Sequence, residues 1–238
     1  MTPTVTPQEI SAVLSTWFHN QFDQLESLAQ TLSAELDLDD AKRLRVADAA
    51  RKRMRQHSAE FLRANPVADG CGLIFSRAAL GSSNGQLEWW VREEDARFAR
   101  YSFGVNPNGD RYYDYEQLEW FTKAYETGTQ AMAGPYIDYL GVEDYIVTLT
   151  TPITVQGIRA GVAGCDIQMT ELEANLVPVL RRLEADSAIL NSHGSVVLGS
   201  SGRFLSGDRM TPPPSGYTTI PLEPASAGLS LLFHGSAS

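Results

Sequence analysis

Three runs decide the fold of this 238-residue chain: Gly134-Pro135-Tyr136-Ile137-Asp138, Val147-Thr148-Leu149-Thr150-Thr151-Pro152-Ile153 and Gly161-Val162-Ala163-Gly164-Cys165-Asp166-Ile167. Each run is short and rich in β-branched, aromatic or small apolar residues, which is typical of a strand. The preceding stretch, Asp114–Phe121, opens a short aromatic helix that we predict over 116–127, ended by Gly128. We interpret Asp114–Ile167 as the wall and floor of a small-molecule pocket.

Two helices are predicted upstream of this segment. Apolar residues recur at helical spacing over 7–36, and Thr6-Pro7-Gln8-Glu9 can form a capping box at the start. Such a helix would be about 45 Å long at 1.5 Å per residue. We therefore expect part of its apolar stripe to pack on a sheet and the rest to meet a partner chain. The second helix is predicted over 41–63.

The remaining sequence predicts antiparallel strands. The hydrophobic period changes to two at about residue 72, and a further helix, capped by Thr170, is predicted over 171–184. The predicted strands are 72–76, 87–92, 97–103, 131–138, 144–155, 158–167, 188–191, 195–199, 217–222 and 229–233. Helices segregated from an antiparallel sheet give the α+β class. We expect one domain over 1–184 and a small antiparallel β annex over 185–238.

Composition narrows the range of partners. The formal net charge of −10 argues against binding to nucleic acid or to an anionic membrane surface. The basic cluster over 42–55 is interpreted as a solvated helix face. The N-terminus lacks the pattern of a signal peptide, and no run approaches the roughly 18 apolar residues of a membrane helix. These features predict a cytoplasmic protein. The two cysteines, Cys71 and Cys165, are expected to be buried thiols.

Taken in order, the long helix, the Trp-containing helix and the three strand runs resemble the Cache (PAS-like) family of sensor domains. The resemblance covers roughly residues 7–200 and is most specific in the series Pro-Tyr-x-Asp, Thr-x-Thr-x-Pro-Ile and Gly-Val-x-Gly-x-Asp-Ile. It implies a long N-terminal helix packed on a central antiparallel sheet, with the annex as an incomplete second PAS-like unit. Family members usually sit outside the cell on membrane receptors. Without a membrane helix or output domain, this chain resembles a free-standing soluble member.

The resemblance also implies a ligand site. Cache domains that bind amino acids use a Tyr, an Arg two residues before a Trp, an aromatic residue after that Trp, the Pro-Tyr-x-Asp pair and a later Asp. Leu118 stands at the position of the Arg, which in the family grips the ligand carboxylate. The implied ligand is a cationic amine (a polyamine, a small amine or a quaternary ammonium compound) held by two Asp residues and an aromatic cage. The aromatic and acidic positions match at Tyr115, Trp120, Phe121, Tyr136, Asp138 and Asp166.

The residues themselves agree with part of this site. On a strand, Tyr136 and Asp138 face the same side, as do Gly164 and Asp166, and the glycine would leave room for a ligand beside the acid. Trp89 and Trp90 face opposite sides, so which of them lines the pocket stays open at this point. The candidate ligand-binding residues are Asp138, Asp166, Trp120, Tyr136, Tyr115, Phe121, Trp90 and Tyr101.

Catalysis finds little support in the sequence. The four histidines are scattered without metal-ligand spacing, and neither a nucleophile elbow nor a phosphate-cradling loop is present. Two carboxylates could act on a sugar, but nothing else favours that reading. We expect a non-enzymatic sensor without cofactor or metal, in which the ligand orders the loop near 139–144 and acts on the long helix. Alternatives are an amino-acid or carboxylate sensor and a ligand-free interaction protein, while a homodimer through the long helix and a regulatory protein stay open as partners.

Overall fold

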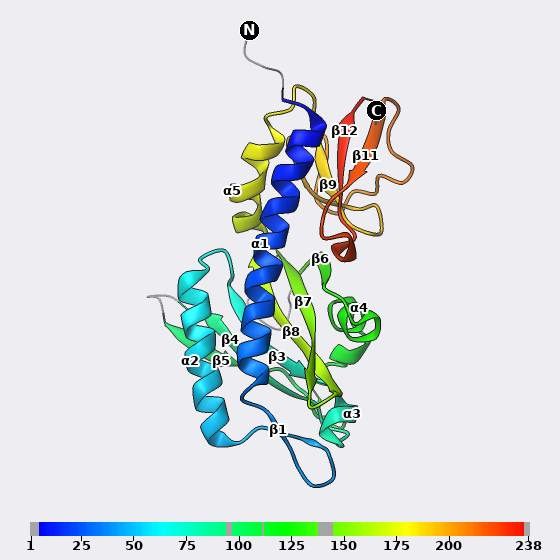
Figure 1. The fold of residues 1–238 in the computed structure, drawn as a ribbon. Coiled ribbons are helices and arrows are strands. Elements are labelled where there is room, and N and C mark those ends of the chain that lie inside the picture. The colour runs from blue at the N-terminus through cyan, green and yellow to red at the C-terminus, as the bar shows by residue number, and fades with distance from the viewer. Residues whose placement is uncertain (1–4, 94–96, 111, 138–144, 236–238) are drawn as a thin grey trace.

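The computed structural model describes residues 5–93, 97–110, 112–137 and 145–235. The long helix α1 runs past two antiparallel sheets, a larger one and a smaller one (Figure 1). This confirms the α+β class and the packing of the N-terminal helix on a central antiparallel sheet. The smaller sheet lies within the predicted annex.

Helix α1 (Pro7–Ser33) begins with the expected capping box. The Thr6 hydroxyl accepts a hydrogen bond from the Glu9 amide at 3.2 Å, and the Glu9 carboxylate accepts from the Thr6 amide at 2.8 Å. The apolar stripe is buried along its length, from Ile10 to Leu32. Besides the larger sheet, α1 contacts α5 (Met169–Leu180) and β11 (Tyr217–Pro221).

The second helix begins later than predicted. Helix α2 spans Asp48–Ala64, and residues before it form a small hairpin of β1 (Asp37–Leu38) and β2 (Leu44–Arg45). The Asp39 carboxylate accepts hydrogen bonds from the Ala41 and Arg43 amides, which fixes the hairpin turn. The Arg43 amide, followed by the Arg45 and Arg43 side chains, holds the pKa of Asp39 at about 2. A polar turn with this local bonding outcompetes a further helical turn.

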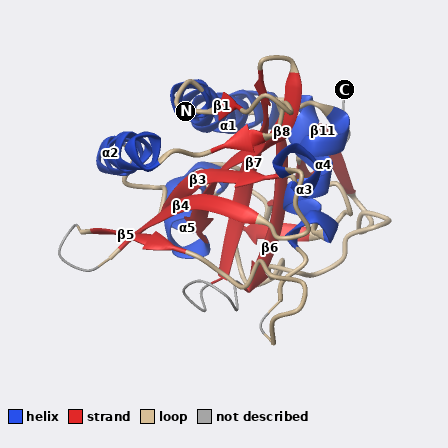
Figure 2. Cartoon of the chain, turned by 90° about the horizontal axis from the view of Figure 1, so that it is seen from below, coloured by secondary structure: helices blue, strands red, loops and turns tan. Residues whose placement is uncertain are grey.

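The larger sheet has six strands in the order β5-β4-β3-β8-β7-β6, all antiparallel. Helices α1 and α2 lie beyond one of its faces (Figure 2). The short helices η2 and α4 pack on the opposite face, whereas the buried residues of the short helix α3, Ala79 and Leu80, belong to the core on the α1 side. The bounds are β3 Gly70–Phe75, α3 Arg77–Leu80, β4 Gln86–Arg92, β5 Phe98–Tyr101, η2 Tyr115–Gln117, α4 Glu119–Thr127, β6 Ala131–Ile137, β7 Tyr145–Val155 and β8 Ile158–Gln168.

Helix α5 leads from the larger sheet to the annex. It is capped at Gln168 rather than at Thr170, and it ends two residues after Pro178. The annex sheet has the order β10-β9-β12-β11, with one face in the main core beneath α1 and α5 and the other face covered by the loop that carries Phe204. Its elements are β9 Ala188–Leu190, β10 Val196–Gly199, β11 Tyr217–Pro221, η3 Ala225–Ala227 and β12 Ser230–His234.

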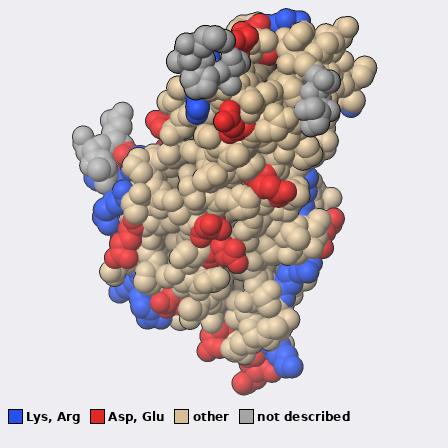
Figure 3. Space-filling view, turned by 45° about the horizontal axis from the view of Figure 1, so that its top comes forward, with Lys and Arg blue, Asp and Glu red and all other residues tan. Residues whose placement is uncertain are grey.

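Charged side chains on the surface are mixed in sign. Along α2 and the preceding hairpin, basic residues form ion pairs with Asp39, Glu35, Asp48 and Glu88. Figure 3 shows blue and red side chains next to one another along the margin of the molecule. Within the described residues, every helix falls short of the length and apolarity that a membrane span requires.

Candidate ligand-binding site

The sheet face opposite α1 carries an aromatic layer. Helix α4 packs on β6, β7 and β8, and buries Trp120 and Phe121 against them. Tyr115 stacks near Trp120, with ring centroids 6.4 Å apart and an interplanar angle of 16°, and meets Phe121 edge-on at 5.4 Å. Gly128, at φ 72°, ends α4 as its sequence predicts. The layer forms the wall that was expected from Asp114–Phe121.

Trp89, and not Trp90, belongs to this layer. Trp90 lies in the core on the α1 side with Cys71 and Cys165, its neighbours across β3 and β8. The Trp89 indole lies over the opposite face: a Cβ on Gly70 would come within 2.8 Å of its Nε1, and one on Gly164 within 3.2 Å of its Cη2. The space beside Asp166 that Gly164 provides is therefore filled by an indole ring, which corrects the expectation that a ligand lies there.

Asp166 is joined to Tyr136 through a threonine. The Thr148 hydroxyl donates to Asp166 Oδ1 at 2.6 Å, and the Tyr136 hydroxyl lies 2.5 Å from Thr148 Oγ1. Because the single Thr148 proton is directed at the carboxylate, Tyr136 is the donor to Thr148. The three side chains form a directed chain across β6, β7 and β8 that orients the carboxylate.

A hollow of about 340 Å³, here called the aromatic hollow, opens beside these hydrogen-bonded side chains. Tyr136 is one of them and also lines the hollow. Leu118 lines the hollow, so the residue at the position of the family arginine does face it. Asp166 lies to one side of the hollow: Thr148 and Ala133 are its next neighbours across the sheet, and Ala133, about 10 Å away at two strand spacings, is in the hollow wall. The described residues that line it are Tyr113, Leu118, Glu119, Trp120, Ala133, Gly134, Pro135, Tyr136 and Asn191.

The annex closes one side of the aromatic hollow. A bulge at Gly134-Pro135 in the edge strand β6 turns the Gly134 carbonyl outward, and Asn191 Nδ2 donates to it at 3.0 Å. Two residues along, His193 Nε2 lies 2.8 Å from Glu119 Oε1. Lys123 binds the same Glu119 oxygen at 2.9 Å. The turn after β9 therefore docks on α4 and β6 together.

Glu119 is the acidic residue at this seam, the contact between the turn after β9 and helix α4. Partial burial opposes its ionisation, but hydrogen bonds from Lys123 and His193 outweigh it and hold the pKa of Glu119 below its ordinary value. The carboxylate is thus ionised at neutral pH and lines the aromatic hollow. Among the described lining residues it is the only one that carries a charge.

The other predicted residues have different positions. Tyr115 is buried and its hydroxyl donates to the Phe75 carbonyl at 2.6 Å, so its polar atom is committed to the fold. Phe121 is buried between Tyr115 and Trp120 and does not line the hollow. Tyr101 pairs with Trp89 on the edge strand β5. Asp138 and the predicted loop 139–144 lie outside the described residues.

Sequence reasoning did not single out Thr148, Asn191 or Glu119. Thr148 sits within a run of β-branched residues with no outward sign of its role. Asn191 follows a short strand far along the chain and meets β6 only through the fold. Glu119, immediately before Trp120, had a usable signal, because an acid in the first turn favours a helix start and lies beside the aromatic wall.

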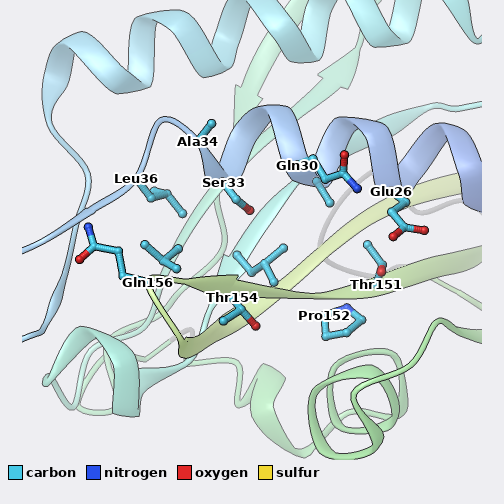
Figure 4. Close-up of a pocket in the computed structure, with 12 residues that line it drawn as sticks. Glu26, Gln30, Ser33, Ala34, Leu36, Thr151, Pro152, Thr154 and Gln156 are labelled. Atoms are coloured by element: carbon cyan, nitrogen blue, oxygen red, sulfur yellow. The ribbon is translucent and has the colours of Figure 1, made fainter.

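A second hollow, here the helix groove, lies between the last turns of α1 and strand β7, and encloses about 470 Å³ (Figure 4). It is lined by Glu26, Ala29, Gln30, Ser33, Ala34, Leu36, Thr151, Pro152, Ile153, Thr154, Val155 and Gln156. None of these described residues is aromatic, so the groove offers no cation–π contact within the described residues. Within the described part of the chain, no three His, Cys, Asp or Glu side chains are placed to hold a metal ion.

Comparisons with known proteins agree with this architecture. Residues 61–174 match the family model of the first PDC sensor domain of proteins similar to methyl-accepting chemotaxis proteins. No curated protein matches the chain in sequence. The fold is shared with solved chemoreceptor domains at low sequence identity.

Three of these structures carry amino acids. The ligand-binding domain of the Pseudomonas fluorescens chemoreceptor CtaA, in complex with L-valine, has a TM-score of 0.59 and 14% identity, over 97% of this chain and 94% of that one. That of the Pseudomonas aeruginosa amino-acid chemoreceptor PctC, with GABA, has a TM-score of 0.56 and 14% identity, over 95% of each chain. That of Campylobacter jejuni Tlp3, with L-norvaline, has a TM-score of 0.62 and 10% identity, over 97% and 87%. The family match over residues 61–174 and the likeness to these structures show that the chain has the fold of Cache-like sensor domains of the PDC type.

Proposed function

We propose that the chain is a non-enzymatic sensor that binds a cationic amine in the aromatic hollow. The observation that carries the proposal is the composition of the hollow wall. It presents the rings of Tyr113, Trp120 and Tyr136 together with the carboxylate of Glu119, and no Lys, Arg or His among its described residues. Aromatic faces and a carboxylate attract an ammonium group, and the basic groups nearest to Glu119, Lys123 and His193, are engaged with its Oε1.

Asp166 adds a second negative charge behind the wall. The hydroxyl chain from Tyr136 through Thr148 directs its protons toward this carboxylate. An ammonium group near Tyr136 would then lie in the field of both Asp166 and Glu119. Such a field favours compounds with one or more positive charges and no carboxylate.

Leu118 distinguishes an amine from an amino acid. All three structural neighbours named above are bound to amino acids, which carry an ammonium and a carboxylate. In this chain the position expected to grip the carboxylate presents an isobutyl group to the hollow. A carboxylate placed against Leu118 would lose its hydration without gaining a donor, which costs several kcal/mol. The amine lacking that carboxylate avoids this loss.

Titration calorimetry with matched ligand pairs tests the proposal. Each amino acid is compared with the amine left when its carboxylate is removed: GABA with propylamine, L-valine with isobutylamine, L-norvaline with butylamine. A diamine such as putrescine extends the series to two charges. We expect the amines to bind at least tenfold more tightly than their partners. Amino acids that bind as tightly as the matched amines, or more tightly, would contradict the amine assignment and favour an amino-acid sensor.

A further inference from the structure

The annex has a hollow of its own, here called the annex hollow. It encloses about 610 Å³ between the end of the annex sheet and the segment 209–213. It lies on the sheet face turned away from α1, because Leu190 and Ser230 are direct partners on β9 and β12, and Leu190 belongs to the cluster on that face. The aromatic hollow has the equivalent place on the larger sheet. Its lining residues are Leu190, Asn191, Ser192, His193, Gly194, Arg209, Met210, Thr211, Pro213, Thr219, Gly228 and Ser230.

The charge of this hollow is opposite to that of the aromatic hollow. Arg209 and His193 are the two basic residues among its described lining, and no Asp or Glu lines it. Arg209 is exposed and takes part in none of the ion pairs found among the described residues. The protein as a whole has a net charge of −10, whereas the ionisable side chains among the described lining of this hollow are both basic.

Hydroxyl groups complete a set of hydrogen-bond donors. Ser192 Oγ accepts a hydrogen bond from Lys123 Nζ at 2.8 Å, so its own proton can be donated elsewhere. Thr211, Thr219 and Ser230 line the same hollow. Gly194, at φ 71°, lets the chain approach Thr211, whose Oγ1 would lie 1.9 Å from a Cβ at that position.

We propose that the annex hollow binds a small anion with carboxylate or phosphate oxygens. The planar Arg209 guanidinium can donate two parallel hydrogen bonds to either group, and the hydroxyls can donate to the remaining oxygens. The two ligand classes share this chemistry and differ in the number of oxygens that the hydroxyls must satisfy. The annex hollow shares only Asn191 with the described lining of the aromatic hollow, and the proposal does not depend on the amine assignment there.

Calorimetry on the full chain at fixed ionic strength tests the proposal. Inorganic phosphate, acetate and succinate are titrated, with chloride as the reference anion. We expect one binding site, and an Arg209→Gln variant that weakens it at least tenfold. Arg55→Gln is the matched control, because Arg55 is exposed on α2, forms no ion pair among the described residues and loses the same charge.

The outcomes separate the ligand classes. Phosphate binding without carboxylate binding assigns the site to phosphate compounds, and the reverse assigns it to carboxylates. Equal losses in Arg209→Gln and Arg55→Gln would reduce the effect to net charge and overturn the proposal, as would absence of saturable binding by all three anions. Propylamine binding should be unchanged in Arg209→Gln, which keeps this result independent of the amine test.

Discussion

Thr148 donates a hydrogen bond to Asp166 across two neighbouring strands, with 2.6 Å between Oγ1 and Oδ1. The pairing depends on a bulge near the far end of the hairpin. Val155 pairs with Ile158 around the Gln156-Gly157 turn, but Ile153 pairs with Gly161, so Ala160 is an extra residue. Without it, Asp166 would lie opposite Val147, whose side chain faces α1. One inserted residue thus places a hydroxyl beside the acid.

Replacing Thr148 by Val tests this relationship. The variant keeps the shape and removes the donor to Asp166 and the acceptor for Tyr136. We expect amine binding to weaken by about 1–2 kcal/mol, roughly fivefold to thirtyfold, as expected for a lost hydrogen bond to a charged group. Calorimetry measures the affinity, and urea unfolding reports stability.

Thr150→Val is the control for this variant. Thr150 is also buried on β7 and faces the same side, but its hydroxyl lies 3.5 Å from the Ala131 carbonyl and away from Asp166. It should lose stability without losing amine affinity. Equal loss of affinity in both variants would mean that Thr148 acts through packing alone.

Asp166→Asn removes the charge and keeps the size. Because Asp166 is reached through Thr148 and does not line the hollow, losing its longer-range attraction should lower the affinity by about 1 kcal/mol, or about fivefold. Asp23→Asn, on the exposed side of α1, removes the same charge at a distance and should leave affinity unchanged. Calorimetry with propylamine compares the two, and unaltered binding to Asp166→Asn would exclude this carboxylate from the site.

Leu118→Arg should restore a grip on carboxylates. The new guanidinium would enter the aromatic hollow beside Tyr136 and offer two donors to the ligand. We expect the preference between GABA and propylamine to move toward GABA by about 1.5–3 kcal/mol, at least tenfold. Leu118→Met, which keeps the volume and adds no donor, should retain the original preference. An arginine variant that is folded and still favours the amine would show that carboxylate selection resides elsewhere.

Much of the fold follows from the sequence pattern, because the hydrophobic period and the turn residues are set by neighbouring positions in the chain. The capping box at Thr6, the β7–β8 hairpin and the stop at Gly128 are predicted and confirmed. The alternation of Trp89 and Trp90 is equally local, but which of them faces α1 depends on how the sheet packs. A usable sign was present in Gly70 and Gly164, since the Trp89 ring occupies the space that they leave.

The candidate site is less predictable, since its parts come from distant segments. Asn191 reaches Gly134 only when the annex docks on β6, and the register that aligns Thr148 with Asp166 depends on a bulge that no turn residue announces. The predicted second helix begins too early, at residue 41 instead of Asp48, because the charged residues before Asp48 suit a helix and a polar hairpin equally well. A cytoplasmic location, a homodimer through α1 and a regulatory partner stay predictions.

The stability supplied by Glu119 should depend on pH. Its pKa is below the ordinary value of 4.5 in the folded protein, so its contribution is present above that value and is lost as the pH falls through the folded pKa. Glu119→Gln should therefore melt below the wild-type protein at pH 6, and the two should converge as the pH is lowered past 4.5. Thermal melts at several pH values measure the difference. A gap that stays constant down to pH 3 would assign the effect to packing.

Asn191 is placed to connect the two hollows, because it lines both of them. Its Nδ2 donates to the Gly134 carbonyl, while its Oδ1 accepts from the His193 and Ser195 amides at 3.0 Å each. Asn191→Asp keeps the acceptor that shapes the turn and sets a carboxylate against the Gly134 carbonyl. The turn should persist while its tie to β6 is lost, at about 1–3 kcal/mol.

Hydrogen exchange of the annex, with and without propylamine, measures this tie. In the wild-type protein we expect amine binding to slow exchange over 191–199, because ordering β6 at Gly134 also orders the turn bonded to it. In Asn191→Asp that protection should disappear while amine still binds. Asn175→Asp is the control, since Asn175 Nδ2 also donates to a backbone carbonyl, at Glu171, but on α5 outside the seam. If Asn191→Asp transmits protection as well as Asn175→Asp does, the remaining contacts from Glu119 to His193 and from Lys123 to Ser192 are sufficient to carry it.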